Sequence, residues 1–320
     1  MTKLSLLPSD SSLTRLIVTI MLLLAASLIP VIGVFFLISL PLFFFILYLK
    51  NDQKKAMTAL TISLGMVLIF LSLAGTALPV LALATMSLAG ILIAQSVRRS
   101  QSIEAIVLFP TLFILGMIVL FFIYAGMKTS MAPWALVEQY ILEAVELNIS
   151  LYSRMPISAE EINAIRDSKD TIIRVFTRIF PALCFIAVAG TVWMNVLAGQ
   201  KWLNRSGLSF SGLEQLSEWK APSWLVWIFI VSGGMSFLPH PQISFAGINF
   251  FLIAVFIYLL QGLAIVSFFF QSKNISFFFR LLIYFLIAVQ QILMIAIAAV
   301  GFFDLWIDFR KYFRKDRTTV

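Results

Sequence analysis

Six long stretches of the chain contain no lysine, arginine, aspartate or glutamate. They are residues 16–49, 56–97, 105–127, 179–200, 221–272 and 281–303. One transmembrane helix needs about 20 apolar residues, so these stretches hold material for eight or nine spans. A soluble domain carries about 25% charged residues, against 12% here, and a β-barrel would alternate in segments of about 10 residues. The sequence therefore predicts an all-α fold, a polytopic transmembrane helical bundle.

Prolines, glycines and charged connectors divide these stretches into spans. The expected spans are 13–29, 31–49, 56–74, 79–97, 105–125, 179–199, 224–238, 246–270 and 281–303. This division predicts an N-terminal bundle in 1–127, a connector in 128–178, a C-terminal bundle in 179–303 and a basic cytoplasmic tail in 304–320. Cations concentrate in cytoplasmic connectors, and nine full spans would put the basic tail outside. Eight spans result if the short run 224–238 does not cross, and nine remains the alternative.

The connector between spans five and six is predicted to form an amphipathic helical insertion on the outer side. Over 134–152, helical periodicity places Glu138 with the polar residues and Trp134 on the opposite, apolar face. Ser158 followed by Glu161 is a capping box that starts a second helix, which is expected to place Arg174 on its polar face and to run on into the sixth span. Both helices are expected to lie on the membrane or on the bundle.

Composition and motifs exclude several kinds of chemistry. With one cysteine, Cys184, and one histidine, His240, the chain cannot form a disulfide or a multi-ligand Cys/His metal centre within itself. It has no phosphate-binding G-x-x-x-x-G-K-[ST] loop, and no ionisable coupling residue inside an apolar run. We expect no enzyme activity, no metal and no cofactor. The net charge of +8 reflects cations beside the spans, so nucleic acid is not expected as a partner.

Neutral polar residues at membrane depth are the candidate ligand-binding groups. They include Asn195, Asn249 and Gln261, with Gly262 beside Gln261. Asn249, Gln261 and Gly262 could line a pocket for a small solute between helices. The same amides could instead make structural hydrogen bonds between helices. Both interpretations remain open from the sequence.

A second set of candidates lies at the predicted membrane interface. Trp224 and Trp227 stand at the start of the seventh span, and the last span ends in a string that contains Asp304, Trp306, Asp308 and Arg310. Asp304 and Asp308 are expected to share a helix face. Tryptophans and cations of this kind anchor helix ends to lipid headgroups, and a docking or gating site is the alternative.

Three of these segments carry a family resemblance. The ending 301–311, the entry Trp219-Lys-Ala-Pro-Ser-Trp-Leu-Val-Trp227 and Tyr258-Leu-Leu-Gln-Gly-Leu-Ala-Ile265 resemble the YybS-like family of bacterial polytopic membrane proteins, which has no assigned activity. That family is distantly similar to the substrate-binding S subunits of energy-coupling-factor transporters, and more loosely to MreD-like proteins. The resemblance implies a compact helical bundle that binds a small solute and is driven by separate ATPase and coupling subunits, with other membrane subunits as expected partners.

Two functions follow as expectations. The first is binding or transport of a small solute in an S-subunit-like bundle without its own energy coupling. The second is a non-catalytic membrane scaffold or assembly factor of the cell envelope, with the 134–152 and 158–178 helices as a partner surface. In both cases the chain is a multi-pass protein of the bacterial inner membrane, in contact with the lipid bilayer.

Overall fold

The structure is a computed structural model that describes residues 12–29, 31–50, 53–76, 79–155, 158–207 and 216–313. Within these ranges every regular element is helical and no strand occurs, which confirms the all-α prediction. The chain divides into two compact units, residues 1–119 with 187–214, and residues 120–186 with 215–320. Helices α5 and α8 each have residues in both units.

The described elements have the following bounds. The helices are α1 (Ser12–Leu28), α2 (Ile32–Lys50), α3 (Gln53–Leu73), α4 (Pro79–Arg98), α5 (Ile103–Thr129), α6 (Pro133–Tyr152), α7 (Ala159–Asp167), α8 (Lys169–Arg205), α9 (Leu225–Ser236), α10 (Pro241–Ser272), α11 (Phe277–Val289) and α12 (Gln291–Ile307). Two short 3₁₀ helices, η1 (Leu216–Glu218) and η2 (Phe309–Phe313), complete the set.

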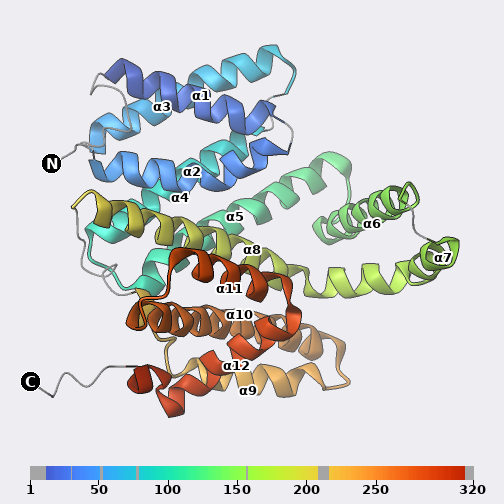
Figure 1. The fold of residues 1–320 in the computed structure, drawn as a ribbon. Helices are drawn as coiled ribbons and strands as arrows, with labels where there is room; N and C mark the ends of the chain where they lie inside the picture. Colours follow the sequence, from blue (N-terminus) through green and yellow to red (C-terminus); the bar gives the residue numbers. More distant parts are fainter. Residues whose placement is uncertain are drawn as a thin grey trace, which may run out of the picture. The chain divides into compact units, whose positions relative to one another are not determined.

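The first unit is built on four helices, with α2 packed along α4, and α1 against both α2 and α3 (Figure 1). The tightest crossing lies where α2 meets α4, because a methyl group at Gly90 would overlap the backbone of Pro41. Phe44 and Phe45 of α2 are fully enclosed in this core. A β-carbon at Gly199 would overlap the ring of Phe45, so this glycine lets α8 approach closely.

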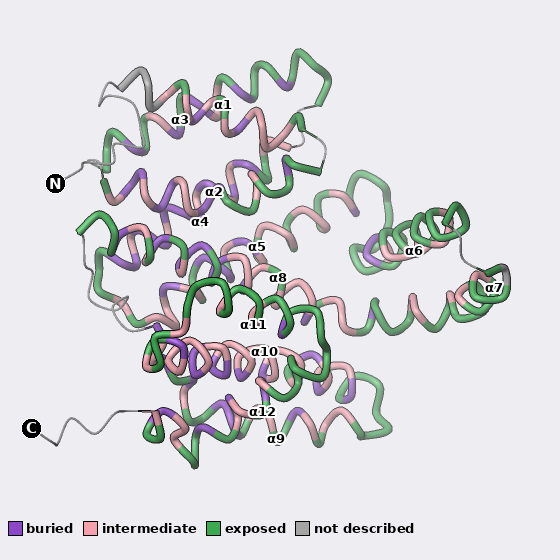
Figure 2. Tube along the Cα trace, in the orientation of Figure 1, coloured by how far each residue is buried: buried purple, intermediate pink, exposed green. Residues whose placement is uncertain are grey.

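The second unit is centred on α10, which packs against α9 on one side and α12 on another. The 3₁₀ helices η1 and η2 also contact α10, and α11 contacts α12. Burial follows this arrangement, because α10 is rich in buried residues whereas α11 is largely exposed (Figure 2).

Six described helices are long and apolar enough to cross a membrane: α2, α3, α4, α5, α8 and α10. The predicted span 281–303 is not a single straight helix, because the chain bends by 102° between α11 and α12. Helix α9 has 12 residues and extends about 18 Å, less than the hydrocarbon thickness of about 30 Å. Counting the bent pair gives up to seven spans, so the predicted eight or nine are not confirmed.

The predicted capping box in the connector is confirmed. Ser158 accepts a hydrogen bond from the Glu161 amide, and the Glu161 side chain accepts one from the Ser158 amide. The helix that it starts, α7, ends at Asp167 and does not run on into the sixth span, because Ser168 caps it before α8 begins. Helix α6 occupies the predicted range. Whether α6 and α7 lie on the bilayer stays a prediction.

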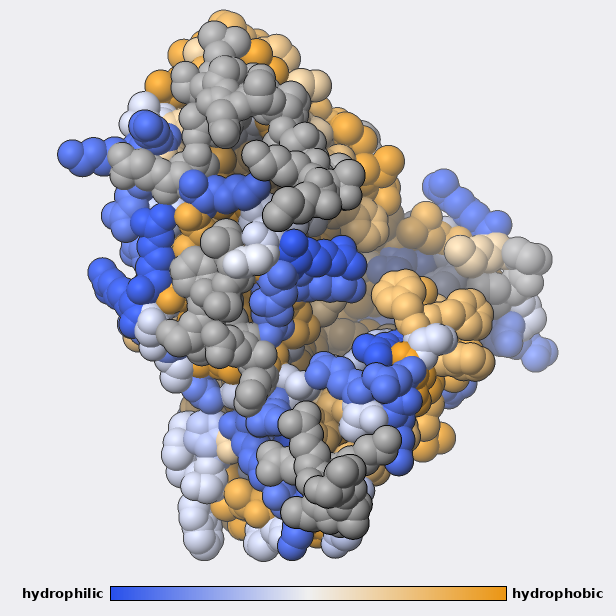
Figure 3. Space-filling view, turned by 60° about the vertical axis from the view of Figure 1, so that its left-hand side comes forward, coloured by the Kyte–Doolittle hydropathy of each residue, from blue (hydrophilic) through white to orange (hydrophobic). Residues whose placement is uncertain are grey.

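Large apolar side chains are exposed along the helices. Leu73 is 85% exposed, Met127 78% and Ile292 79%. On the face seen in Figure 3, hydrophobic side chains cover wide areas and hydrophilic ones gather separately. A soluble monomer rarely exposes apolar area on this scale, whereas a helix in contact with lipid needs it.

Candidate functional site

Asn249 bridges a break in α8 that a proline creates. Pro181 interrupts the helical hydrogen-bond ladder, because proline has no amide hydrogen and its ring displaces the preceding turn. The Ala182 amide donates to Asn249 Oδ1 at 2.9 Å, and Asn249 Nδ2 donates to the Arg178 carbonyl at 2.9 Å. The same nitrogen also donates to the Phe245 carbonyl of its own helix. The Asn249 side-chain amide thus bridges the Ala182 amide and the Arg178 carbonyl, which would bond each other directly in an unbroken helix.

Asn195 makes the same arrangement in the first unit. The Leu42 amide donates to Asn195 Oδ1 at 2.8 Å, and Asn195 Nδ2 donates to the Ile38 carbonyl at 2.9 Å. These two backbone groups flank Pro41 as Ala182 and Arg178 flank Pro181. Both asparagines are nearly fully buried. We call each of these a proline clamp.

Gln261 belongs to a buried polar cluster with Asp304 and Arg310. Arg310 Nη1 donates to Asp304 Oδ2 at 2.6 Å, and Gln261 Nε2 donates to the same oxygen at 3.0 Å. Arg310 also donates to the carbonyls of Ser217 and Trp219. These contacts tie α10, α12, η2 and the segment before α9 together. Asp304 is 1% exposed and Arg310 2%.

This cluster corrects two expectations about the C-terminal string. Arg310 was expected at lipid headgroups, but its guanidinium is enclosed and bonded to protein groups. Asp304 and Asp308 do not share a helix face, because α12 ends at Ile307 and Asp308 adopts a left-handed conformation with φ 47°. Asp308 instead forms an exposed ion pair with Lys220 at 2.9 Å. Trp224, Trp227 and Trp306 are 59%, 67% and 60% exposed, and their anchoring role stays a prediction.

The structure does not bring Asn249 and Gln261 to one site. They lie 12 residues apart on α10, which is about 18 Å along the helix axis. The polar atoms of both amides are bonded to protein groups, because Gln261 Oε1 accepts from the Ala221 amide at 3.0 Å. Both amides therefore make structural contacts, and their ligand-binding role stays a prediction.

Gly262 serves a close helix crossing. A methyl group there would overlap the carbonyl oxygen of Ile297 on α12, and one at Gly301 would overlap the carbonyl oxygen of Tyr258 on α10. The two helices therefore touch backbone to backbone, as small residues permit in membrane bundles.

Replacement of Gly262 by alanine is expected to destabilise the second unit by about 1 to 3 kcal/mol, because overpacking against a backbone atom forces the helices apart. The measurement is the temperature at which purified protein loses its monodisperse chromatographic peak. Gly234→Ala is the matched control, since a β-carbon at Gly234 meets no atom within 4 Å. Equal midpoints for the two variants would contradict the assigned contact.

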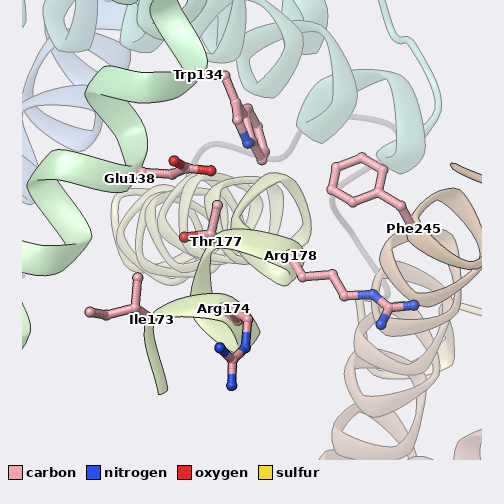
Figure 4. A pocket seen from close by; sticks show the side chains of 7 residues that line it. All are labelled: Trp134, Glu138, Ile173, Arg174, Thr177, Arg178 and Phe245. Atoms are coloured by element: carbon pink, nitrogen blue, oxygen red, sulfur yellow. The ribbon is translucent and has the colours of Figure 1, made fainter. Parts of the chain in front are cut away.

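A pocket of about 740 Å³ lies between α6, α8 and α10 of the second unit. Its apolar lining consists of Trp134, Ile173 and Phe245, with the rings of Trp134 and Phe245 at 5.8 Å between centroids (Figure 4). The pocket is open to its surroundings.

Three charged side chains and one hydroxyl complete the lining: Glu138, Arg174, Arg178 and Thr177. Arg178 Nη2 donates to Ser244 Oγ at 2.5 Å, and Arg174 Nη2 to Thr171 Oγ1 at 3.0 Å. No ion pair in the described part of the chain involves Glu138, Arg174 or Arg178. Among the residues that the structure describes, the charges of this pocket therefore have no partner of opposite sign.

Thr177 is the most unusual member of this lining. The residue is 7% exposed, yet its Oγ1 has no hydrogen-bond partner. Most threonines within helices can bond a carbonyl of the preceding turn, and a buried hydroxyl without a partner costs about 1 to 3 kcal/mol. Among the described residues only Ser63 Oγ and Gln101 Oε1 share this condition, and neither lines the pocket.

Sequence reasoning did not find this pocket. It assigned Glu138 to the face opposite Trp134, but residues four apart on a helix are neighbours, and both line the pocket. It assigned Arg174 to the polar face of the second connector helix and attached no role to Arg178 or Thr177. The spacing of Trp134 and Glu138 was the available signal.

The described residues hold no cluster of three or more His, Cys, Asp or Glu side chains suited to a metal ion. No curated protein and no solved structure matches the chain. The model of the family "Predicted membrane protein (DUF2232)" matches residues 17–305. This match supports the expectation of a multi-pass membrane protein in contact with lipid, while the YybS-like name and the S-subunit similarity stay predictions. The chain belongs to the DUF2232 family of predicted membrane proteins.

Proposed function

We propose that the protein binds a small solute in the pocket between α6, α8 and α10, and that it does so without energy coupling of its own. The buried hydroxyl of Thr177, which lacks a partner, carries the proposal. A bound ligand with a polar group would give this hydroxyl the hydrogen bond that the protein does not. The proposal places the protein in the bacterial inner membrane.

The two arginines support a ligand with a negatively charged group. A guanidinium presents several donors in a planar fork that matches phosphate and carboxylate oxygens. Arg178 uses Nη2 on Ser244 and is held in place by that bond. Trp134 and Phe245 add apolar surface to the pocket. The ligand is therefore an amphiphile with an anionic group.

Asn249 is proposed as a positioning residue for this site. Its proline clamp holds the carbonyl of Arg178, and the same amide holds the carbonyl of Phe245. Both residues line the pocket. Asn249 would therefore contribute to ligand binding indirectly, because it fixes the backbone of two residues that line the pocket.

Native mass spectrometry of protein purified in mild detergent from its own host tests the proposal. We expect a co-purifying small molecule in the wild type, lost or reduced about tenfold in Arg178→Gln and Thr177→Val, because each removes a hydrogen bond to the ligand. The matched controls are Arg166→Gln, an exposed arginine on α7 outside the pocket, and Thr191→Val, whose hydroxyl bonds the carbonyl of Ala187 in its own helix. Equal retention in all four variants would contradict the proposed site.

A further inference from the structure

The charges around the pocket are arranged for a ligand that carries both signs. This inference rests on the proposed function and specifies its ligand. In Figure 4, Glu138 points into the pocket from α6, whereas Arg178 extends below Phe245 and Arg174 points away from α6. We infer that the pocket binds a phosphoamine headgroup, a phosphate joined to a primary ammonium, as found on phosphatidylethanolamine.

The arginine side of the pocket suits the phosphate. Arg174 and Arg178 are one helical turn apart on α8 and both line the pocket, but their guanidiniums extend in different directions in Figure 4, with Arg178 the one beside Phe245. Thr177 lies between them in sequence, and its hydroxyl can donate to a phosphate oxygen. Donors on separate side chains reach a ligand from different directions, which suits the tetrahedral oxygens of a phosphate better than a planar carboxylate.

The Glu138 side of the pocket suits the ammonium. A carboxylate facing a site for an anion repels that anion, unless the ligand also carries a positive charge. Glu138 has no cationic partner in the described ranges, so an ammonium would supply one. Trp134 lies one turn before Glu138 on α6 and offers an indole face, the ring that attracts cations most strongly. A purely anionic ligand would interact favourably with neither the Glu138 carboxylate nor the Trp134 indole face.

The position of the pocket along α8 favours a lipid as the source of this group. Arg178 is the last charged residue before the uncharged stretch 179–200, so it marks the depth at which α8 enters the bilayer. Phosphates of lipids lie at that depth. Trp134 and Phe245 give acyl or glycerol carbons an apolar wall. A lipid headgroup therefore reaches the pocket without leaving the membrane.

Native mass spectrometry of delipidated protein in mild detergent tests this inference. The protein is titrated separately with phosphatidylethanolamine, phosphatidylglycerol and the soluble glycerophosphoethanolamine. We expect phosphatidylethanolamine to bind about tenfold more tightly than phosphatidylglycerol, because only its ammonium meets Glu138. Glu138→Gln should remove this preference, whereas Glu143→Gln, an exposed glutamate on α6 bonded to Gln139, should keep it.

The other outcomes separate the two proposals. Equal or tighter binding of phosphatidylglycerol to the wild type, lost in Arg178→Gln, would overturn the phosphoamine inference and leave the proposed binding function intact. A preference for phosphatidylethanolamine that survives Glu138→Gln would also overturn it. Glycerophosphoethanolamine binding as tightly as the lipid would overturn the lipid source. If Arg178→Gln weakened the binding of none of the three compounds, both proposals would be overturned.

Discussion

Asp304→Asn is expected to lower the stability of the protein by about 3 to 5 kcal/mol, because it leaves the Arg310 guanidinium buried without a counter-charge. Asp304 Oδ2 accepts from both Arg310 and Gln261, and Oδ1 accepts from the Phe309 amide. In asparagine an NH₂ group replaces one carboxylate oxygen, so it would face an N–H donor of Arg310, Gln261 or Phe309 without an acceptor between them. The measurement is the midpoint of chemical or thermal unfolding in detergent, together with the yield of monodisperse protein.

The chain supplies a matched control for this ion pair. Asp308→Asn removes a carboxylate from an ion pair whose side chains are about half exposed, and asparagine tolerates the left-handed backbone at this position. Exposed pairs contribute about 0 to 1 kcal/mol. Similar losses for Asp304→Asn and Asp308→Asn would contradict the assigned burial.

Asn249→Ala is expected to cost about 2 to 4 kcal/mol, because it deprives two buried backbone groups of a partner. These are the Ala182 amide and the Arg178 carbonyl, which flank Pro181. Asn148→Ala is the control, since that amide donates only to the Ala144 carbonyl of its own exposed helix. The unfolding midpoint in detergent reports the difference.

A second substitution tests whether the proline is the reason for this cost. Pro181→Ala removes the ring that displaces the preceding turn, so the Ala182 amide can bond the Arg178 carbonyl directly and Asn249→Ala should cost less in that background. Ligand retention should fall in Asn249→Ala as well, because the Arg178 backbone is no longer fixed. If Asn249→Ala lowered the free energy of unfolding equally with proline and with alanine at position 181, the claim that Asn249 compensates for this proline would be wrong.

The sequence predicted those parts of the fold that depend on local pattern. Unbroken apolar stretches located α2 to α5, α8 and α10, and Ser158 with Glu161 located the start of α7. The bend at Gln290 was missed because that residue lies inside an apolar, uncharged run with no proline or glycine beside it. Composition alone cannot distinguish a straight span from a broken one.

The polar clusters and the pocket depend on contacts between residues far apart in the sequence, which no local pattern predicts. Asn249 was identified as a polar residue at membrane depth, but its partners on α8 lie about 70 residues away in sequence. Arg310 and Asp304 were assigned to the lipid interface from their position after an apolar run, since the segment at Ser217 and Trp219 that encloses Arg310 could not be inferred. Arg174, Arg178 and Thr177 line one pocket only once α6 and α10 are placed beside α8.

The most direct test of ligand binding in this pocket is an experimental structure of the wild-type protein in nanodiscs that contain phosphatidylethanolamine. We predict a bound molecule between Trp134 and Phe245, with an anionic group on Arg178 and an oxygen within hydrogen-bonding distance of Thr177 Oγ1. A pocket closed by an ion pair between Glu138 and Arg178, with Thr177 bonded to a carbonyl of its own helix, would contradict the account.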